Sequence, residues 1–169
     1  MRTVILLASL FAGVFSVAWA EEEKSQQQIE IEKLSFLVGH WAGTGQTFAK
    51  DGTKSTYHDD EQVWFDVQNS LLIIQANGSK NGNHYYGIHT VIYYDVEAEH
   101  YWYNPFTARG SRPYRCNLEQ QLFRCYSLDN KNRLSFLRLP DGEWNEYGET
   151  LENGIWRKTF ETILTATES

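Results

Sequence analysis

Histidine and glutamate side chains are the groups in this chain that could carry acid–base chemistry. His89 lies in the middle of an apolar and β-branched segment, and Glu146 lies two residues after Trp144. A carboxylate beside an imidazole shifts the pKa values of both groups and can transfer a proton. An interior pair of His89 and Glu146 would therefore suit general acid–base catalysis. The favoured alternative is a structural role. His89 is then a partly buried imidazole whose ring nitrogens are hydrogen-bonded, and the glutamates form the solvated face of a half-buried strand.

The five histidines do not form a metal-binding pattern. His84 and His89 are five residues apart and fall on opposite faces of a strand, while His58 and His100 belong to other segments. The chain also lacks a serine-centred elbow, a phosphate loop and a nucleotide-binding fingerprint. We therefore expect no metal and no cofactor, and the sequence identifies no catalytic residue.

The spacing of apolar residues predicts one short helix followed by strands. Ile31, Leu34 and Leu37 form a single stripe of a short helix that ends at Gly39. After Trp41, strand-like segments alternate with turn residues about every ten positions, which is typical of an all-β sandwich or barrel. Residues 77–82 are predicted to be a turn. Strands are predicted at 41–48, 56–67, 70–76, 84–94, 100–106, 112–117, 121–128, 133–139, 143–151 and 155–165.

These strands predict an all-β fold, a single antiparallel up-and-down barrel of about ten strands with a short N-terminal helix. A meander of this size exposes the fewest edges when it closes on itself. An immunoglobulin-like sandwich has fewer strands and lacks the helix that leads into Gly39 and Trp41. Gly39 lets the chain turn into the first strand, and Trp41 has the bulk to fill one end of a barrel.

Cys116 and Cys125 are the only cysteines. If residues 112–128 form a hairpin that turns at Gln120 and Gln121, the two cysteines lie directly opposite each other, within disulfide range. The alternative is a catalytic or metal-binding thiol pair, but two cysteines alone make a poor metal site. A structural disulfide is therefore expected.

Residues 1–20 have the features of a signal peptide. Arg2 precedes an almost unbroken apolar run over 4–17, and residues 18–20 read Ala-Trp-Ala, a small-x-small cleavage pattern. The run is short for a membrane span, so an uncleaved anchor is the less favoured alternative. We expect residues 21–33 to be a polar lead-in containing the start of the helix, and 34–166 to be the barrel domain. The protein is then exported, periplasmic or secreted, and soluble after cleavage.

The charge of the chain disfavours two classes of partner. The formal net charge is -7, and removal of Arg2 with the signal peptide makes it -8. Nucleic acids and anionic membranes are bound by basic surfaces, so neither is expected as a partner. No partner protein can be named from the sequence.

The opening Gly-x-Trp resembles the signature of lipocalins and of the wider group of calycin barrels. Other segments look similar to small secreted bacterial lipocalin-like proteins of unknown function; the matching stretches are Phe36–Gly45, Gly87–His89, Tyr93–Asp95, Gly142–Glu149 and Trp156–Glu161. The resemblance implies a lipocalin-type or fatty-acid-binding-type barrel with a cavity for a small apolar molecule. It also implies that an arginine on a late strand packs against the signature tryptophan. Arg157 is the candidate for this role, and the neighbouring Lys158 could serve as well. A haem-binding nitrobindin opens similarly, but its late histidine has no counterpart after His100.

Three functions remain open at this stage. The first, and the favoured one, is binding of a small hydrophobic or amphipathic molecule, because such barrels commonly enclose room for one ligand. The second is an enzyme that uses the His89–carboxylate pair, and the third is a packed scaffold that binds a protein partner. For the ligand site we predict His89 and Glu146 as polar contacts and Trp102 and Tyr86 as walls. Strand alternation allows only one of Tyr86 and His89 to point inward.

Overall fold

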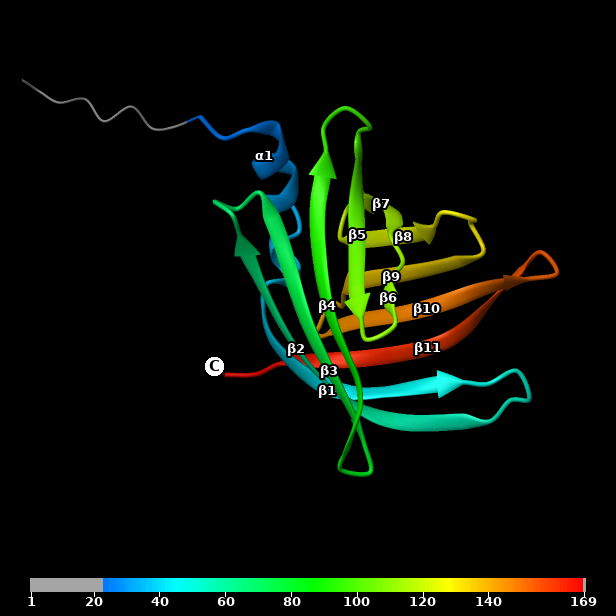
Figure 1. Cartoon of the computed structure of the whole chain (residues 1–169). Helices are drawn as coiled ribbons and strands as arrows, with labels where there is room; N and C mark the ends of the chain where they lie inside the picture. The colour runs from blue at the N-terminus through cyan, green and yellow to red at the C-terminus, as the bar shows by residue number, and fades with distance from the viewer. Residues whose placement is uncertain (1–22, 169) are drawn as a thin grey trace, which may run out of the picture.

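The chain folds into one closed antiparallel barrel of ten strands (Figure 1). The computed structural model describes residues 23–168. Consecutive strands are neighbours throughout, the last strand pairs with the first, and the pairing of β4 with β5 completes the ring. The predicted fold class is therefore confirmed. The predicted signal peptide lies outside the described residues.

The elements follow one another along the chain with short turns. The two-residue strand β6 forms a hairpin with β5, and the chain then continues into β7, so the two together serve as one interrupted barrel strand. The elements are α1 (Gln26–Glu32), the 3-10 turn η1 (Ser35–Leu37), β1 (Gly39–Phe48), β2 (Lys54–Asp66), β3 (Leu71–Lys80), β4 (Asn83–Asp95), β5 (His100–Thr107), β6 (Gly110–Ser111), β7 (Tyr114–Glu119), β8 (Leu122–Ser127), β9 (Asn132–Arg138), β10 (Trp144–Glu152) and β11 (Ile155–Ala166).

One predicted turn is wrong in its extent. Strand β3 runs on to Lys80, so Asn77 and Gly78 lie within a strand, and the turn is made by Asn81 and Gly82 alone. Both turn residues have positive φ values, of 52° and 74°, the backbone conformation of the two-residue turns that join hairpin strands. The predicted turn included Asn81 and Gly82 but began four residues too early, because Asn77 and Gly78 were also counted as turn residues.

The helical segment closes one end of the barrel. Ser25 caps α1, which therefore begins within the stretch expected to be a polar lead-in. Ile31, Leu34 and Leu37 are all buried, as their spacing predicted, but the single predicted helix is divided into α1 and η1, and Leu34 lies between them. The Tyr101 hydroxyl of β5 donates a hydrogen bond of 3.1 Å to the Glu30 carbonyl oxygen, which fastens the helix to the barrel rim. None of the helices in the described part of the chain is long and apolar enough to cross a membrane.

Trp41 fills the closed end beneath this helical segment, as predicted. Its indole Nε1 donates a hydrogen bond of 2.8 Å to the Leu37 carbonyl oxygen, and its ring meets Trp144 edge-on with centroids 5.7 Å apart. The cation over the Trp41 ring is the guanidinium of Arg138, 4.3 Å from the centroid. Arg157, to which the family resemblance gave this role, is instead exposed on β11 and pairs with Glu152. Arg138, on the strand before β10, is the arginine that reaches the tryptophan.

The cysteine hairpin has the predicted register. β7 and β8 are joined by Gln120 and Gln121, and Cys116 lies opposite Cys125 with a disulfide between them. Both cysteines are fully buried and point into the barrel core.

Replacing Trp41 with alanine tests the closed end. We expect Trp41→Ala to lower the free energy of unfolding by about 3–5 kcal/mol, because it removes a buried ring and leaves a cavity. The exposed Trp64 provides the control, and Trp64→Ala should cost much less. Urea unfolding monitored by circular dichroism measures both; equal losses would contradict the assigned role of Trp41.

The disulfide gives a second stability prediction. Replacing both Cys116 and Cys125 with serine should lower the free energy of unfolding by roughly 2–3 kcal/mol, since a short loop is no longer closed in the unfolded chain. Reduction of the native protein by dithiothreitol should lower the melting temperature by a similar amount as the double substitution. A double variant as stable as the oxidised protein would contradict the prediction.

Candidate functional site

A cavity of about 780 Å³ opens at the barrel end opposite the helix. It is bordered by the start of β4 and by the β5–β6 hairpin, whereas α1 packs at the other ends of β4 and β5. The barrel is therefore filled in its closed half and open in its other half.

Aromatic and aliphatic side chains form most of the cavity wall. Arg109 and Arg112 lie at its mouth, on and just after the β5–β6 turn, and both are exposed. Within residues 23–168, Glu146 is the only carboxylate on the wall. The apolar and aromatic lining residues are Tyr57, Tyr85, Tyr86, Ile88, Tyr103, Pro105, Ala108, Tyr114, Leu134, Phe136 and Phe160.

Two more acidic side chains lie inside the barrel next to Glu146. On β2 every second residue points inward, so Asp59 and Glu61 share the interior face with Tyr57 and Val63. Asp59 is 1% exposed and Glu61 is 3% exposed. One carboxylate oxygen from each of Asp59, Glu61 and Glu146 lies within 4.8 Å of the other two. We call these three residues the acidic triad.

Glycines on β1 make this convergence possible, although β1 and β11 separate β2 from β10. Gly45 lies opposite Tyr57 on one side and Thr162 on the other, and Thr162 lies opposite Glu146. A Cβ atom at Gly45 would come within 2.1 Å of the Tyr57 ring. Without it, the Tyr57 hydroxyl reaches across β1 to the Thr162 hydroxyl, with 2.7 Å between the two oxygens. Side chains from β2 can thus approach those of β10 across the barrel wall.

Gly78 on β3 has the same role for another tyrosine of the cavity wall, Tyr86. It lies opposite Tyr86 and next to Asp59 in the register of β3 with its neighbours. A Cβ atom at Gly78 would lie 2.2 Å from the Tyr86 ring. The glycine therefore lets the Tyr86 ring fold over the strand, toward the acidic triad and the cavity.

The buried position of the acidic triad raises the pKa values of its three carboxyl groups. Burial raises the pKa of Glu146 to about 8. Burial, and then the negative charge of Glu146 and Asp59, raises the pKa of Glu61 well above its ordinary range. Burial also raises the pKa of Asp59, although the Tyr86 hydroxyl beside it offsets part of the rise. No lysine or arginine within residues 23–168 forms a salt bridge with the triad, so the charged forms lack a counter-charge.

The triad offers either exchangeable protons or a set of oxygen ligands. Glu146 borders the cavity, while Asp59 and Glu61 are not part of its wall and lie deeper in the interior. Carboxylate oxygens are the ligands that hard divalent cations prefer. Among the described residues, these three are the acidic, histidine or cysteine side chains that converge closely enough to hold a metal ion.

The structure divides the predicted ligand-binding residues into two pairs. Tyr86 and Glu146 both line the cavity. His89 points outward, where its Nδ1 lies 3.0 Å from the Gln75 side-chain oxygen. Trp102 also points outward, and its Nε1 donates a hydrogen bond to Asp95. The His89–Glu146 pair considered for acid–base catalysis is therefore not formed, because the two residues lie on opposite faces of the barrel wall.

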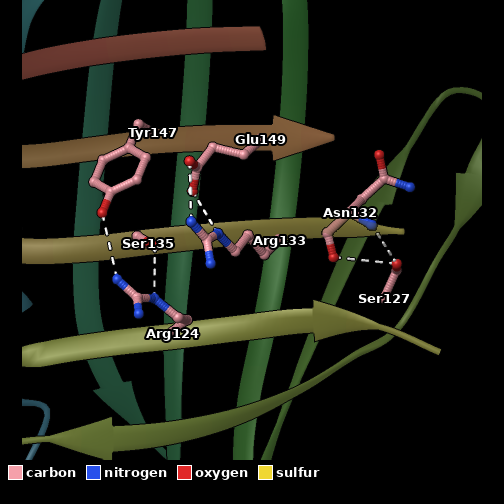
Figure 2. Close-up of polar contacts among 7 residues, drawn as sticks. All are labelled: Arg124, Ser127, Asn132, Arg133, Ser135, Tyr147 and Glu149. Carbon is pink, nitrogen blue, oxygen red and sulfur yellow. Dashed lines mark hydrogen bonds and ion pairs between the residues drawn. The ribbon is translucent and has the colours of Figure 1, made fainter. Parts of the chain in front are cut away.

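Glu149 belongs to a separate polar network on the outer surface (Figure 2). The Arg133 guanidinium donates to both Glu149 oxygens, at 2.5 and 3.1 Å, and packs 4.3 Å above the Trp156 ring. Arg124 donates to the hydroxyls of Ser135 and Tyr147. These contacts link β8, β9 and β10 from outside. Arg133 and Glu149 are paired with each other, Arg124 is hydrogen-bonded to neutral hydroxyls, and none of them borders the cavity, so we assign them a structural role.

The sequence contained a signal for Asp59 and Glu61 that our sequence interpretation did not use. Tyr57 and Val63 predict which face of β2 is buried, and strict alternation then places Asp59 and Glu61 on that same face. Consecutive acids at 59, 60 and 61 cannot all be solvated on a strand that is buried on one side. No comparable pattern shows that Glu146 would be their neighbour, because this contact depends on barrel closure.

The pKa shifts predict a pH dependence of stability. An unfolded glutamate titrates near pH 4.5, and folded Glu146 titrates near 8, so the folded protein holds an extra proton between these values. The stabilisation is complete below about pH 4.5 and is lost as the pH rises through 8, with about 1.4 kcal/mol per pH unit for each such proton. Glu146→Gln should make this decline shallower in urea unfolding with EDTA at pH 5, 6.5 and 8.

Glu149→Gln is the matched control for this measurement. It lies three residues away on the same strand, but its charge is paired on the outer surface. Its unfolding free energy should fall with pH as steeply as that of the native protein. A Glu146→Gln variant whose pH dependence is parallel to the native one would contradict the assigned titration.

The comparisons with known proteins agree with the fold. No family model matches the chain, and no curated protein matches it. Among solved structures it is similar to Rv2717c from M. tuberculosis, with a TM-score of 0.59 and 12% identity over 82% of this chain and 97% of that one. It is also similar to the S-type phycobiliprotein lyase CPES from Guillardia theta, with a TM-score of 0.57 and 9% identity over 86% and 99%. At these identities the likenesses show the fold alone.

Proposed function

We propose that this protein binds a small amphipathic molecule in the open half of its barrel. The observation that carries the proposal is the cavity of about 780 Å³. Pockets for small molecules typically have volumes of about 300–1,000 Å³ and are mostly apolar, with a few polar groups that fix orientation. The cavity has this composition, with Glu146 and several tyrosine hydroxyls among aromatic walls.

The arrangement of the walls supports a ligand with a flat, apolar body. Aromatic side chains favour ring-shaped ligands, because offset-stacked and edge-to-face contacts add to the burial of apolar area. Tyr57, Tyr86 and Tyr103 approach the cavity from three neighbouring parts of the wall. Arg109 and Arg112 at the mouth are positioned to attract an acidic group at the outer end of such a ligand. The ligand then has an apolar inner part and a polar outer part.

Two observations support a protein that acts outside the cytoplasm. The buried disulfide between Cys116 and Cys125 is of the kind that persists in oxidising compartments. The apolar run at residues 4–17 with its small-residue cleavage pattern supports export by a signal peptide. Binding of a diffusible small molecule in the periplasm or outside the cell is consistent with both.

A substitution that fills the cavity tests the proposal. We expect 1-anilinonaphthalene-8-sulfonate, an aromatic sulfonate, to bind with a stoichiometry of one and with increased fluorescence. Ile88 points into the cavity, so Ile88→Trp should weaken this binding at least about tenfold by occupying the ligand volume. His89→Ala, at the next residue but on the outer face, should bind as the native protein does.

Circular dichroism and melting temperature will establish that both variants are folded. Equal binding by native protein and Ile88→Trp would place the dye outside the cavity and refute the proposed site. Native mass spectrometry of protein purified from its own host should also show a co-purified small molecule that the Ile88→Trp variant lacks.

A further inference from the structure

Asp59 is an unusual carboxylate, because it is buried without any partner. Both of its carboxylate oxygens are inaccessible to solvent and neither has a hydrogen-bond partner among the described residues. The Tyr86 hydroxyl and the Asp60 backbone lie close enough to lower the pKa of Asp59, but neither forms a hydrogen bond of normal geometry with its carboxylate. Buried polar groups are nearly always paired, and an unpaired buried carboxylate is strongly disfavoured. A missing partner at this position therefore requires an explanation.

Protons on the neighbouring glutamates offset only part of this cost. Protonation of Glu61 and Glu146 lowers the negative charge of the interior, but it places no positive charge beside Asp59. The nearby phenols of Tyr57 and Tyr103 are directed elsewhere, since Tyr57 bonds to Thr162 and Tyr103 to Thr90. A positively charged group that contacts all three carboxylates would satisfy Asp59 and remove the repulsion at once.

The spacing of the oxygens leaves room for a hard cation as large as Ca²⁺. Ca²⁺ binds oxygen ligands at 2.3–2.6 Å, so two ligands on opposite sides of the ion are about 4.6–5.2 Å apart. In the acidic triad no pair of the converging oxygens is more than 4.8 Å apart. Mg²⁺ requires shorter distances of about 2.0–2.1 Å, and softer metals prefer nitrogen or sulfur ligands. The triad presents oxygen alone.

We propose that Asp59, Glu61 and Glu146 form a binding site for a hard divalent cation of the size of Ca²⁺. Three carboxylates and no basic side chain supply the negative charge, and the cavity beside Glu146 supplies an entry path and water for the remaining coordination positions. This site does not depend on the proposed function, because Asp59 and Glu61 lie behind the wall that an amphipathic ligand would touch.

The test uses the full mature protein, freed of metal with EDTA and then dialysed. Isothermal titration with CaCl₂ should show one saturable site. At a Ca²⁺ concentration a hundred times the Kd, the melting temperature should rise by about 5–10 °C, as expected for a domain of this size. Asp59→Asn and Glu61→Gln, which keep the shape of the side chains, should each lose most of the binding and of the thermal shift.

Glu149→Gln is the matched control and should respond to Ca²⁺ as the native protein does. The absence of a thermal shift and of binding heat in the native protein would overturn the proposal, as would an undiminished response in both triad variants. Stabilisation by hexylammonium chloride but not by CaCl₂ would also overturn it, because the triad would then recognise an organic ammonium group. Binding of 1-anilinonaphthalene-8-sulfonate to the Asp59→Asn variant separates the two proposals. We expect this variant to bind the dye as the native protein does, even though it has lost the Ca²⁺ site.

Discussion

Closure of ten strands into a barrel fixes an interior volume that side chains either fill or leave open. In this protein the two outcomes occur in different halves. At the end covered by α1, the rings of Trp41 and Trp144 meet edge-on and the core is solid. Toward the other end, Gly45 on β1 and Gly78 on β3 lie where a Cβ atom would meet the rings of Tyr57 and Tyr86. These two glycines admit the rings, so the open half has an aromatic wall and a polar floor formed by the acidic triad.

The polar floor is energetically unfavourable for the folded state, and the closed half compensates for it. Three carboxyl groups in an apolar interior are either neutralised by protons or repel one another, and in both cases folding loses their hydration. The tryptophan pair of the closed half lies directly beside the triad. Trp41 is opposite Glu61 in the register of β1 and β2, and Trp144 is two residues before Glu146 on β10. The packed core therefore borders the destabilising cluster, and its burial of apolar surface offsets the cost of the carboxylates. A functional site that is maintained at a cost in stability is common in proteins.

Most of the fold could be predicted from the sequence because its determinants are local. The ten strands, the short helix, the position of Trp41 and the cysteine hairpin each follow from alternation, turn residues or spacing over fewer than twenty residues. The predictions about which arginine covers Trp41 and which residues meet Glu146 depended on strand neighbours far apart in sequence. Arg138 reaches Trp41 because β9 lies next to β10, and no local pattern distinguishes it from Arg157. His89 was predicted to contact a ligand because its sequence neighbours are apolar. Strand alternation puts Tyr86 and His89 on opposite faces, and since Tyr86 points inward, His89 points outward.

Glu146 connects the two proposed sites, since it borders the cavity and contributes to the acidic triad. Without a cation its raised pKa keeps it largely protonated below pH 8, and its hydroxyl then offers a hydrogen-bond donor to a ligand in the cavity. With a cation bound, Glu146 would be a charged carboxylate that holds the cation, and the cation would offer its remaining coordination positions to a ligand in the same space. A ligand with a carboxylate or carbonyl at its inner end is favoured in the second state. Thermodynamic reciprocity then requires that such a ligand raise the affinity for the cation by the same factor by which the cation raises the affinity for the ligand.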